Sequence, residues 1–388
     1  MSNRQTAPVP GARQQPEWYS DSVLADVRAE LSRRRPLVNC SRLRALQDAL
    51  VRVVSGRAFL LQAGDCAETF RESSPGHVLV KAYELASLSR IFEQITGTPV
   101  VTVGRLAGQY AKPRSGSVET LPDGRALPVY RGDAVNGHEA VESARIADPA
   151  RLLAAYDNSA AVLETLYGDP RYYGIYTSHE ALLLDYEKPL TRWCKCISSD
   201  YVTSAPFIWI GDRTRQIDSA HIAWAESIAN PVGLKVGPSA DAGEIAELVE
   251  RLTAGRPAGR LSIITRMGAQ NIGTALPKLI RRIEEKAIWV CDPMHGNTVT
   301  RSTGEKARLL FAIAEEVRRF VDILQAEGLP PGGIHLEQTT AGVDECVTSP
   351  AELSSPALRY RSRCDPRLNP DQARQVVSAA AEMIARSR

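Results

Sequence analysis

The sequence predicts an α/β protein built on a closed (β/α)₈ TIM barrel, and two observations support that prediction. Eight short apolar runs recur from residue 58 onward, and helical patterns follow most of them. Strands that alternate with helices pair in parallel through right-handed crossovers, and eight such units favour a closed barrel. The expected strands are residues 58–62, 100–103, 172–176, 207–210, 232–236, 261–265, 288–291 and 333–336.

Two regions precede the first expected strand. Residues 1–16 are polar and rich in proline, glutamine and arginine, so we expect a disordered tail. Residues 17–57 carry two stretches with apolar residues on one helical face, separated by Pro36, and they predict an N-terminal helical extension. Residues 58–388 then form the predicted catalytic barrel.

The helices and connections of the barrel follow in chain order. The expected helices are residues 79–95, 216–228, 242–252, 272–283 and 307–324. The long link at residues 107–171 holds an expected hairpin at residues 122–124 and a helix at residues 151–166. A doubly wound open sheet is the alternative fold, but residues 64–66 after the first strand are not the glycine-rich phosphate turn of that fold.

Composition argues against several classes of protein. The 388 residues include 47 basic and 45 acidic ones, and a net charge of +2 gives no case for nucleic-acid binding. No apolar run approaches the roughly 20 residues of a membrane span, and residues 1–16 lack a secretory apolar segment. Seven scattered cysteines favour a reducing, cytoplasmic location. Cys194 and Cys196 are expected to be ordinary thiols, because no second cysteine pair stands at zinc-site spacing.

Chemistry-bearing side chains follow every predicted strand. In a (β/α)₈ barrel the working residues lie at the C-terminal ends of the strands. One such residue alone is more often a buried thiol or a surface ion pair, but the recurrence in every unit favours a functional site. The residues are Cys66, Arg105, His179 with Glu180, Arg213, Lys235, Arg266, His295 and Glu337.

Four candidates are metal ligands by residue type. Cys66, His295 and Glu337 follow or end predicted strands, and Asp365 lies in a loop near the C-terminus. One thiolate, one imidazole and two carboxylates form a mixed donor set for a divalent ion. The sequence therefore predicts a metalloenzyme whose fold gathers these distant residues.

Four other candidates are cations. Arg105, Arg213, Lys235 and Arg266 would converge on one mouth, where like charges imply a multiply anionic ligand. Arginine forks suit carboxylate and phosphate, whereas a lysine acts as a point charge. The basic loop at residues 112–115 is suited to a separate phosphate. The sequence thus predicts two anionic substrates that meet at a metal.

Around these residues the chain resembles the type II 3-deoxy-D-arabino-heptulosonate 7-phosphate (DAHP) synthases. The matching segments run in the family's order from about residue 18 to the C-terminus. They are residues 64–68, 103–115, 130–133, 178–181, 213–216, 230–233, 235–238, 266–268, 292–298 and 364–369. The resemblance implies a metal-dependent transferase that condenses phosphoenolpyruvate with erythrose 4-phosphate and water to give DAHP and phosphate. That reaction is the first step of the shikimate pathway.

The resemblance also implies roles for single residues. The residues that match the metal ligands, and are expected to be catalytic together with Lys235, are Cys66, His295, Glu337 and Asp365. The residues that match the phosphoenolpyruvate contacts are Arg105, Arg213, Lys235 and Arg266. The residues expected near the aldose phosphate are Lys112, Pro113, Arg114, Ser115 and Asn136. The expected ion is Mn²⁺ or Co²⁺, with Zn²⁺ as an alternative because of the thiolate.

The implied partners are the two substrates and further copies of the chain, as a homodimer or homotetramer. Neither nucleic acid nor a membrane is expected. The rival interpretations are an amino-DAHP synthase that takes a nitrogen-bearing aldose phosphate, and a non-catalytic homologue that binds a partner such as chorismate mutase. No residue indicates chorismate mutase.

Three local features qualify the resemblance. The loop at residues 339–349 lacks glycines that the family usually has after the glutamate ligand, and Asp212 stands where a glutamate is usual. Residues 166–170 join a helix directly to a strand and leave no room for the helical hairpin that longer members use for aromatic amino acid inhibition. Such short forms resemble members from secondary metabolism, as in phenazine biosynthesis.

Cys364 adjoins Asp365, so we expect it near Cys66, where loss of metal would let the two thiols form a disulfide.

Overall fold

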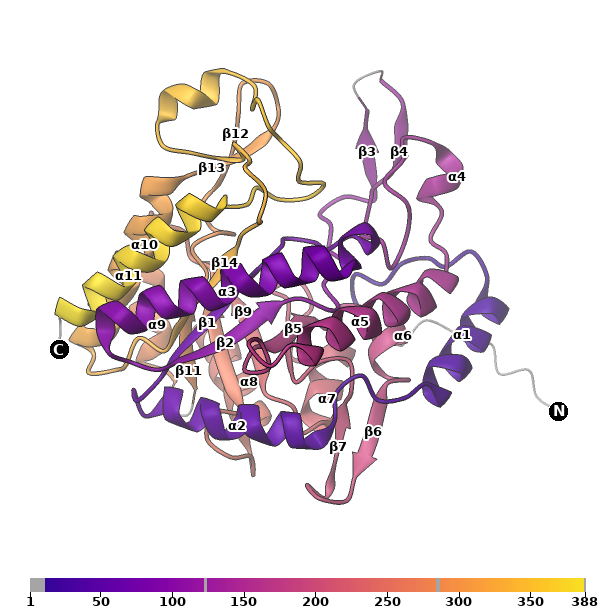
Figure 1. The fold of residues 1–388 in the computed structure, drawn as a ribbon, viewed down its shortest axis with the longest axis horizontal. Coiled ribbons are helices and arrows are strands. Elements are labelled where there is room, and N and C mark those ends of the chain that lie inside the picture. Colours follow the sequence, from indigo (N-terminus) through magenta and orange to yellow (C-terminus); the bar gives the residue numbers. More distant parts are fainter. Residues whose placement is uncertain (1–10, 122–123, 284–286, 387–388) are drawn as a thin grey trace.

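Eight parallel strands close into a barrel in a computed structural model that describes residues 11–121, 124–283 and 287–386 (Figure 1). The strand order around the barrel is β1-β14-β11-β10-β9-β8-β5-β2. The strands are β1 (Phe59–Gly64), β2 (Val100–Arg105), β5 (Tyr176–Glu180), β8 (Phe207–Ile210), β9 (Val232–Val236), β10 (Leu261–Thr265), β11 (Ile288–Cys291) and β14 (Gly333–Glu337). The predicted (β/α)₈ barrel is confirmed, and most of the expected tail, residues 1–10, lies outside the described residues.

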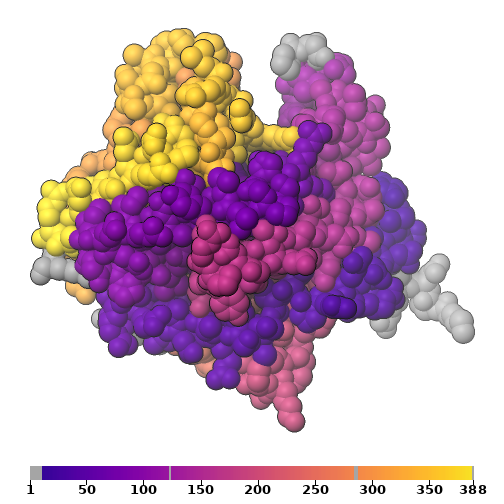
Figure 2. Space-filling view, in the orientation of Figure 1, coloured from indigo at the N-terminus to yellow at the C-terminus, as the bar shows by residue number. Residues whose placement is uncertain are grey.

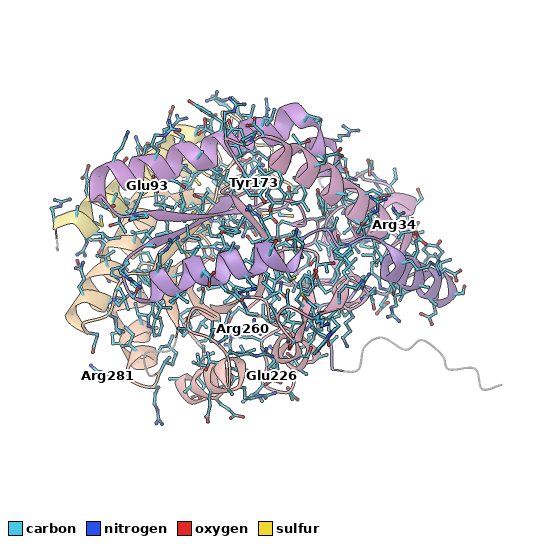
Figure 3. All side chains as sticks on the ribbon, turned by 60° about the horizontal axis from the view of Figure 1, so that its bottom comes forward. Arg34, Glu93, Tyr173, Glu226, Arg260 and Arg281 are labelled. Atoms are coloured by element: carbon cyan, nitrogen blue, oxygen red, sulfur yellow. The ribbon has the colours of Figure 1, made fainter. Side chains whose placement is uncertain are left out.

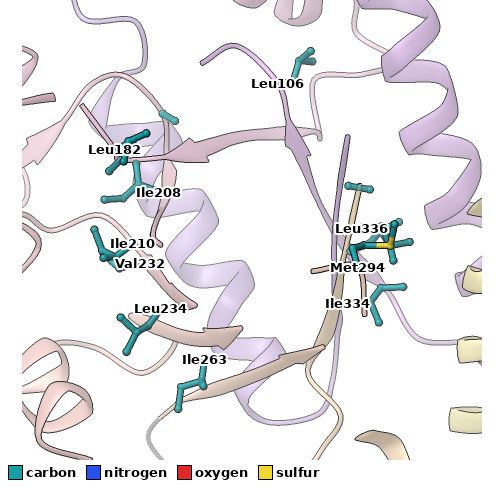
Figure 4. Close-up of a cluster of buried hydrophobic side chains, with 14 of the residues drawn as sticks. Leu106, Leu182, Ile208, Ile210, Val232, Leu234, Ile263, Met294, Ile334 and Leu336 are labelled. Atoms are coloured by element: carbon teal, nitrogen blue, oxygen red, sulfur yellow. The ribbon is translucent and has the colours of Figure 1, made fainter. Parts of the chain in front are cut away.

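Helices surround the barrel on its outside (Figure 1). The barrel helices and the two short helices of the connections are α3 (Pro75–Thr96), α4 (Glu142–Arg145), α5 (Ala150–Gly168), α6 (Leu184–Glu187), α7 (Ala220–Ser227), α8 (Ala242–Thr253), α9 (Ile272–Ile280), α10 (Leu310–Ala326) and α11 (Pro370–Arg386). The outward-facing strand side chains, such as Leu234, Ile263 and Leu336, pack against these helices in one large apolar cluster (Figure 4). Burial of this cluster is the main force that fixes the strands in place.

Helix α2 closes the N-terminal end of the barrel. The extension forms α1 (Asp21–Arg33) and α2 (Cys40–Val54), on either side of Pro36 as predicted. Leu46 and Leu50 of α2 join Leu60, Val101 and other inward-facing strand residues in a second buried apolar cluster. Apolar side chains therefore fill the half of the barrel interior that lies toward the N-terminal ends of the strands. The division of the chain into a tail, an extension and a barrel domain stays a prediction.

The barrel interior changes from apolar to polar toward the C-terminal ends of the strands. Side chains two residues apart on a strand share one face. Leu60 is thus followed inside the barrel by Gln62, and Val101 and Val103 are followed by Arg105. On each strand, every second side chain points into the barrel. This alternation decides which residues reach the polar layer near the C-terminal ends of the strands.

The third strand begins later than predicted. The aromatic run at residues 172–176 was expected to be a strand, but β5 starts only at Tyr176. The preceding residues form turns, with the Ile175 amide donating to the Tyr172 carbonyl at 2.9 Å. Tyr173 instead points outward (Figure 3), and the Arg42 guanidinium of α2 lies 4.7 Å from its ring centroid. Tyr172 and Ile175 are buried in the large apolar cluster, so the apolar signal here comes from packing outside the barrel and not from pairing in the sheet.

Two helices also start later than predicted. The expected helix at residues 216–228 begins at Ala220, because the Ser219 hydroxyl caps it by accepting from the Ile222 amide at 3.3 Å. The expected helix at residues 307–324 begins at Leu310, because the first residues of that stretch belong to a small sheet. The helix expected at residues 151–166 is confirmed as α5.

Short sheets and turns follow the C-terminal ends of β1, β2, β11 and β14. They are the hairpin β3 (Val118–Thr120) with β4 (Ala126–Pro128), the sheet of β12 (Thr298–Thr300), β13 (Lys306–Leu309) and β15 (Cys346–Val347), and the 3₁₀ helices η1 (Phe70–Ser73) and η2 (Pro350–Ser354). The β3–β4 hairpin forms one lobe, and the β12–β13–β15 sheet with the loops around η2 forms another, with a hollow between them (Figure 2). The strands β3 and β4 confirm the expected hairpin, although residues 122–123 of its turn lie outside the described residues.

The opposite end of the barrel carries cations with structural roles. The buried Arg260 guanidinium donates to the carbonyl oxygens of Ala225 and Ile228, at 2.5 Å and 3.1 Å, and so holds the corner between α7 and β9. Glu226, close to Arg260 in Figure 3, pairs with Arg251 at 2.6 Å. The hairpin of β6 (Thr191–Cys194) and β7 (Ser199–Val202) projects from this end. Among the described residues, no helix has the length and apolarity needed to cross a bilayer.

Candidate active site

The barrel brings the four predicted metal ligands together. Donor atoms of Cys66, Glu337 and Asp365 lie within 4.8 Å of one another. His295 joins them, because its Nε2 atom lies 3.2 Å from Glu337 Oε1. The register explains much of this convergence: Gly64 of β1 lies between Glu337 of β14 and the end of β2, so Cys66 follows β1 directly beside Glu337.

Neighbouring groups orient each member of this set. The Asp365 amide donates to Cys66 Sγ at 3.3 Å and fixes the C-terminal loop against β1. His295 Nδ1 donates to Asp292 Oδ2 at 2.7 Å, which leaves Nε2 free to face Glu337. Carboxylate-to-imidazole contacts of this kind fix the tautomer of a metal-binding histidine.

Buried cations hold Glu337 in its charged form. Glu337 Oε1 accepts from Arg105 at 3.0 Å and from Lys112 at 3.2 Å, and Arg308 lies 3.0 Å from Oε2. Burial alone would raise the pKa of Glu337, but His295, Lys112 and Arg308 hold that pKa well below its usual range. A permanently ionised carboxylate at this position suits a metal ligand.

Asp365 and Cys66 complete the donor set in different protonation states. Burial opposes ionisation of Asp365, yet Lys112 and other cations lower its pKa. Lys306 Nζ also contacts Asp365 Oδ1 at 2.8 Å. Burial raises the pKa of the Cys66 thiol well above its usual range. The sulfur, nitrogen and oxygen donors fit a divalent cation, and thiols bind such ions as thiolates.

One cavity joins this donor set to the predicted cations. Its wall includes all four cations expected at the barrel mouth, together with two of the ligands. The lining residues are Arg105, Lys112, Pro113, Glu180, Trp209, Gly211, Asp212, Arg213, Lys235, Arg266, His295 and Asp365. An anion in this cavity would therefore contact several cations and lie next to the donor set.

Arg105 is fixed by a chain of buried polar groups. Its Nε donates to the Asp65 carbonyl at 2.9 Å and its Nη1 donates to His335 Nε2 at 2.6 Å. His335 Nδ1 in turn donates to Gln62 Oε1 at 2.7 Å. Burial holds the pKa of His335 well below its usual range, so the ring stays neutral and accepts from the arginine. His335 and Gln62 are thus positioning residues. The sequence signal that identifies them is their place on strands, at positions whose side chains point into the barrel.

Asp292 connects the two halves of the site. It is fully buried, and it accepts from Lys235 Nζ as well as from His295 Nδ1. Burial lowers the pKa of Lys235 to about 8, against the opposing attraction of Asp292. The Trp209 ring lies beneath the mouth, with Arg105 Cζ 5.0 Å and Lys235 Nζ 6.0 Å from its centroid. Sequence reasoning assigned no role to Asp292 or Trp209.

The two outer cations have weaker restraints. Arg266 pairs with Asp212 at 2.8 Å, and Arg213 donates to the Ser115 hydroxyl at 2.9 Å. Asp212 also accepts from Arg215 at 2.9 Å, so the shorter side chain that replaces the usual glutamate still reaches both arginines. Arg213 and Arg266 therefore keep freedom to turn toward a ligand.

The basic loop divides into two groups. Lys112 and Pro113 line the cavity, and Ser115 reaches it through Arg213. Among the described contacts, Arg114 faces Glu119 at 3.9 Å. Asn136 forms three hydrogen bonds within its own loop, with the Arg131 amide and the carbonyls of Val129 and Arg145. The structure therefore gives Asn136 a role in loop architecture, and contact of Asn136 or Arg114 with an aldose phosphate stays a prediction.

The neighbouring residues His179 and Glu180 have different surroundings. His179 Nε2 lies 2.7 Å from Glu187 Oε1, and Glu187 also accepts from Ser204 at 2.6 Å, so His179 is part of a buried structural network. Glu180 lines the cavity instead. Burial raises the pKa of Glu180, although Lys112 and Lys235 oppose that effect.

The altered loop beyond Glu337 is anchored to the loop that carries Asp365. Glu345 is fully buried and accepts from Arg367 and from the amides of Arg361 and Ser362. Arg367 also pairs with Asp65 at 2.8 Å. This network fixes the position of Asp365 without the family's glycines. Glu345 and Arg308 carry no motif signal, because their partners lie far away in sequence.

A (β/α)₈ barrel with a mixed metal donor set beside a cationic cavity defines a metal-dependent enzyme for anionic substrates. The profile of the class-II DAHP synthetase family matches residues 3–171 and 170–381. The chain belongs to this family.

Similar proteins cover nearly the whole chain. A probable phospho-2-dehydro-3-deoxyheptonate aldolase of Pseudomonas fluorescens is 41% identical over 382 residues, which covers 95% of this chain and 94% of that protein. A phospho-2-dehydro-3-deoxyheptonate aldolase of Streptomyces coelicolor is 39% identical over 447 residues, covering 98% of each. The solved phospho-2-dehydro-3-deoxyheptonate aldolase of Francisella tularensis has a TM-score of 0.55 at 13% identity, covers 94% of this chain and 97% of that one, and supports the fold alone.

Proposed function

We propose that this enzyme condenses phosphoenolpyruvate with erythrose 4-phosphate and water to give DAHP and inorganic phosphate. The observation that carries the proposal is the single cavity where Arg105, Arg213, Lys235 and Arg266 meet the donor set that includes His295. Phosphoenolpyruvate carries a carboxylate and a phosphate on a small skeleton, so its charges match this cluster of cations.

The cations hold phosphoenolpyruvate in a defined orientation. Arg105 cannot turn, because three acceptors and a pair with Glu337 restrain it, so it supplies a fixed positive charge with one remaining N–H group at the base of the cavity. Lys235 adds a point charge above Trp209. Arg213 and Arg266 close on the ligand from the rim. Holding the enol at reacting distance from the aldehyde lowers the entropic part of the barrier.

The donor set would hold the divalent ion beside this anion. An ion bound by Cys66, His295, Glu337 and Asp365 supplies Lewis acidity toward the aldehyde oxygen. We propose Mn²⁺ or Co²⁺, since two carboxylates and an imidazole favour them, with Zn²⁺ as the alternative that the thiolate admits. Lys112 stabilises both carboxylates, at 3.2 Å from Glu337 and 3.6 Å from Asp365, and keeps them ionised.

The aldose phosphate is proposed to bind toward residues 112–115. Pro113 lines the cavity and Ser115 already contacts Arg213, so this loop adjoins the proposed phosphoenolpyruvate site. Arg114 would turn from Glu119 to reach the phosphate, and Asn136 would act by supporting the loop. The metal-side end of the cavity would then receive the aldehyde.

We propose further that aromatic amino acids do not inhibit this enzyme. Helix α5 ends at Gly168 and β5 begins at Tyr176, with only a short turn between them. The family profile matches in two parts that meet at residues 170–171, which supports a segment missing from this chain at that point. Strong inhibition of the purified enzyme by phenylalanine, tyrosine or tryptophan would contradict this proposal. A cytoplasmic homodimer or homotetramer remains our expectation.

The decisive experiment measures phosphate release from chelated protein after metals and aldose phosphates are returned one at a time. We expect turnover with phosphoenolpyruvate, erythrose 4-phosphate and Mn²⁺ or Co²⁺, and little without metal. Arg266→Gln should raise the KM for phosphoenolpyruvate, whereas Arg281→Gln on the exposed surface should not. Turnover only with a nitrogen-bearing aldose phosphate would make the chain an amino-DAHP synthase. No consumption of phosphoenolpyruvate with any metal would make it a non-catalytic homologue.

A further inference from the structure

Three cysteines gather outside the catalytic cavity, between α2 and the β6–β7 hairpin. Cys40 is the first residue of α2, Cys194 is the last residue of β6, and Cys196 lies in the following turn. The Sγ atom of Cys196 lies 2.7 Å from that of Cys40 and 2.8 Å from that of Cys194. All three sulfur atoms lie within 4.8 Å of one another. In Figure 1, α2 and this hairpin meet at the lower side of the molecule.

We propose that Cys40, Cys194 and Cys196 form a second metal site, which binds one thiophilic divalent ion such as Zn²⁺ through three thiolates and one water molecule. Zinc–sulfur bonds of about 2.3 Å in a tetrahedral site place sulfur atoms about 3.8 Å apart. The two shorter sulfur separations must open by about 1 Å to match that spacing. Rotation of the half-buried and exposed cysteine side chains can supply this change.

The surroundings of the three sulfur atoms suit such an ion. On the inner side, buried Leu43, Tyr201 and Ala229 form an apolar floor against which Cys40 and Cys194 pack. On the outer side, Cys196 is exposed, so an ion can arrive from solvent and keep a water ligand. The three sulfur atoms therefore have an uncharged apolar surface on one side and solvent on the other. An ordinary buried thiol is enclosed by apolar groups on all sides.

The helix position of Cys40 favours a thiolate, although its contacts with the Cys194 and Cys196 thiols raise the pKa of Cys40 to about 12. Cys40 stands at the N-terminus of the 15-residue helix α2, and Asn39 caps that helix by accepting from the Arg42 amide at 3.0 Å. The positive end of a helix dipole stabilises a thiolate in the first turn. Lys195 lies between the two hairpin cysteines and adds a cation that offsets the charge of a zinc trithiolate.

Binding requires no oxidant or reductant. Each of the three thiols loses its proton as its sulfur–metal bond forms, and the hydrated ion keeps one water molecule and releases the others. A disulfide, by contrast, would join two sulfur atoms and leave the third without a role. The convergence of all three on one point favours the metal. The sequence spacing alone hid this site, because Cys40 and Cys196 are 156 residues apart in the chain.

A metal here would fasten the N-terminal helices to the barrel. Helix α2 seals the lower end of the barrel through Leu46 and Leu50. A ligand that binds only the folded state raises the melting temperature. The site is therefore expected to be structural, with its effect on stability rather than on turnover.

The test uses Co²⁺ as a probe in a Cys66→Ser background, where the catalytic donor set has no sulfur. We expect a sulfur-to-cobalt charge-transfer band that saturates at one equivalent and disappears on addition of Zn²⁺. Adding Cys196→Ser should abolish the band, and adding Ser199→Ala, at the start of β7, should leave it unchanged. The wild-type melting temperature should rise with Zn²⁺ by more than that of Cys196→Ser.

A second measurement needs no variant. Unmodified protein is alkylated with and without Zn²⁺ and its peptides are mapped by mass spectrometry. We expect Zn²⁺ to protect Cys40, Cys194 and Cys196 together. The proposal is overturned if all three are alkylated equally fast with Zn²⁺ present. It is also overturned if non-reducing maps of freshly purified protein show a disulfide between two of them.

Discussion

Replacing Asp292 with asparagine should move the alkaline limit of activity to lower pH. Asp292 keeps Lys235 protonated, and burial has already lowered the pKa of Lys235 to about 8. Below that pH the ammonium is present and attracts phosphoenolpyruvate, and above it the charge is lost. The ratio kcat/KM for phosphoenolpyruvate reports the free enzyme, so in the wild type it should begin to fall near pH 8.

The size of the effect follows from the buried ion pair. Two unit charges about 4 Å apart at an effective dielectric constant near 20 attract by about 4 kcal/mol. At about 1.4 kcal/mol per pKa unit, loss of that attraction lowers the pKa of Lys235 by up to about three pH units. The ammonium then becomes a minor species at neutral pH, and kcat/KM at pH 7 should fall by about 100-fold.

The assay records pH profiles of kcat/KM for the wild type and three variants by phosphate release. Lys235→Arg should lose the limb near pH 8, because a guanidinium does not titrate there. Asp212→Asn is the matched control: it removes the carboxylate that pairs with Arg266, so it should weaken binding without moving the limb. A folded Asp292→Asn enzyme whose alkaline limb stays near that of the wild type would refute the reasoning.

Three other perturbations test separate parts of the molecule. Glu337→Gln leaves buried cations without a counter-ion and should destabilise the metal-free protein by about 3–5 kcal/mol in urea unfolding, and unchanged unfolding would count against that ion network. Leu50→Ala should cost about 2–5 kcal/mol without changing the KM for phosphoenolpyruvate, whereas Val51→Ala on the exposed face of the same helix should cost under about 0.5 kcal/mol. Equal losses from the two would show that α2 does not seal the barrel. Cys66 and Cys364, which share one small cluster as free thiols, should form a disulfide only in chelated, oxidised protein; non-reducing peptide maps that find both thiols free would contradict this.

The barrel was predictable because its strands are short, apolar and regularly spaced. The expected strand at residues 261–265 coincides with β10, for example. The third strand was misplaced because Tyr172 and Tyr173 are as apolar as strand residues, although Tyr172 lies in the large apolar cluster and Tyr173 packs on Arg42. Local sequence carries no sign of a partner on a distant helix, so this error was not avoidable from periodicity alone.

The candidate site was predictable where a residue sits at a strand end. Lys235 and Glu337 are of this kind, and both reach the polar layer of the barrel. Arg308 and Glu345 were missed, since they act from a small sheet and from a loop whose positions depend on the whole fold. Asn136 stands in a basic, polar region of sequence, yet its hydrogen bonds all serve its own loop.

Because α2 closes the N-terminal end of the barrel, it also limits the route by which ligands can reach the cavity. Because Leu46, Leu50 and their neighbours fill the N-terminal end of the barrel, ligands would reach the described cavity from the C-terminal ends of the strands. Of the four cations at the barrel mouth, Arg105 has the smallest exposed fraction, 2% against 4% for Lys235. If Arg105 holds phosphoenolpyruvate as proposed, we expect that substrate to bind before the aldose phosphate.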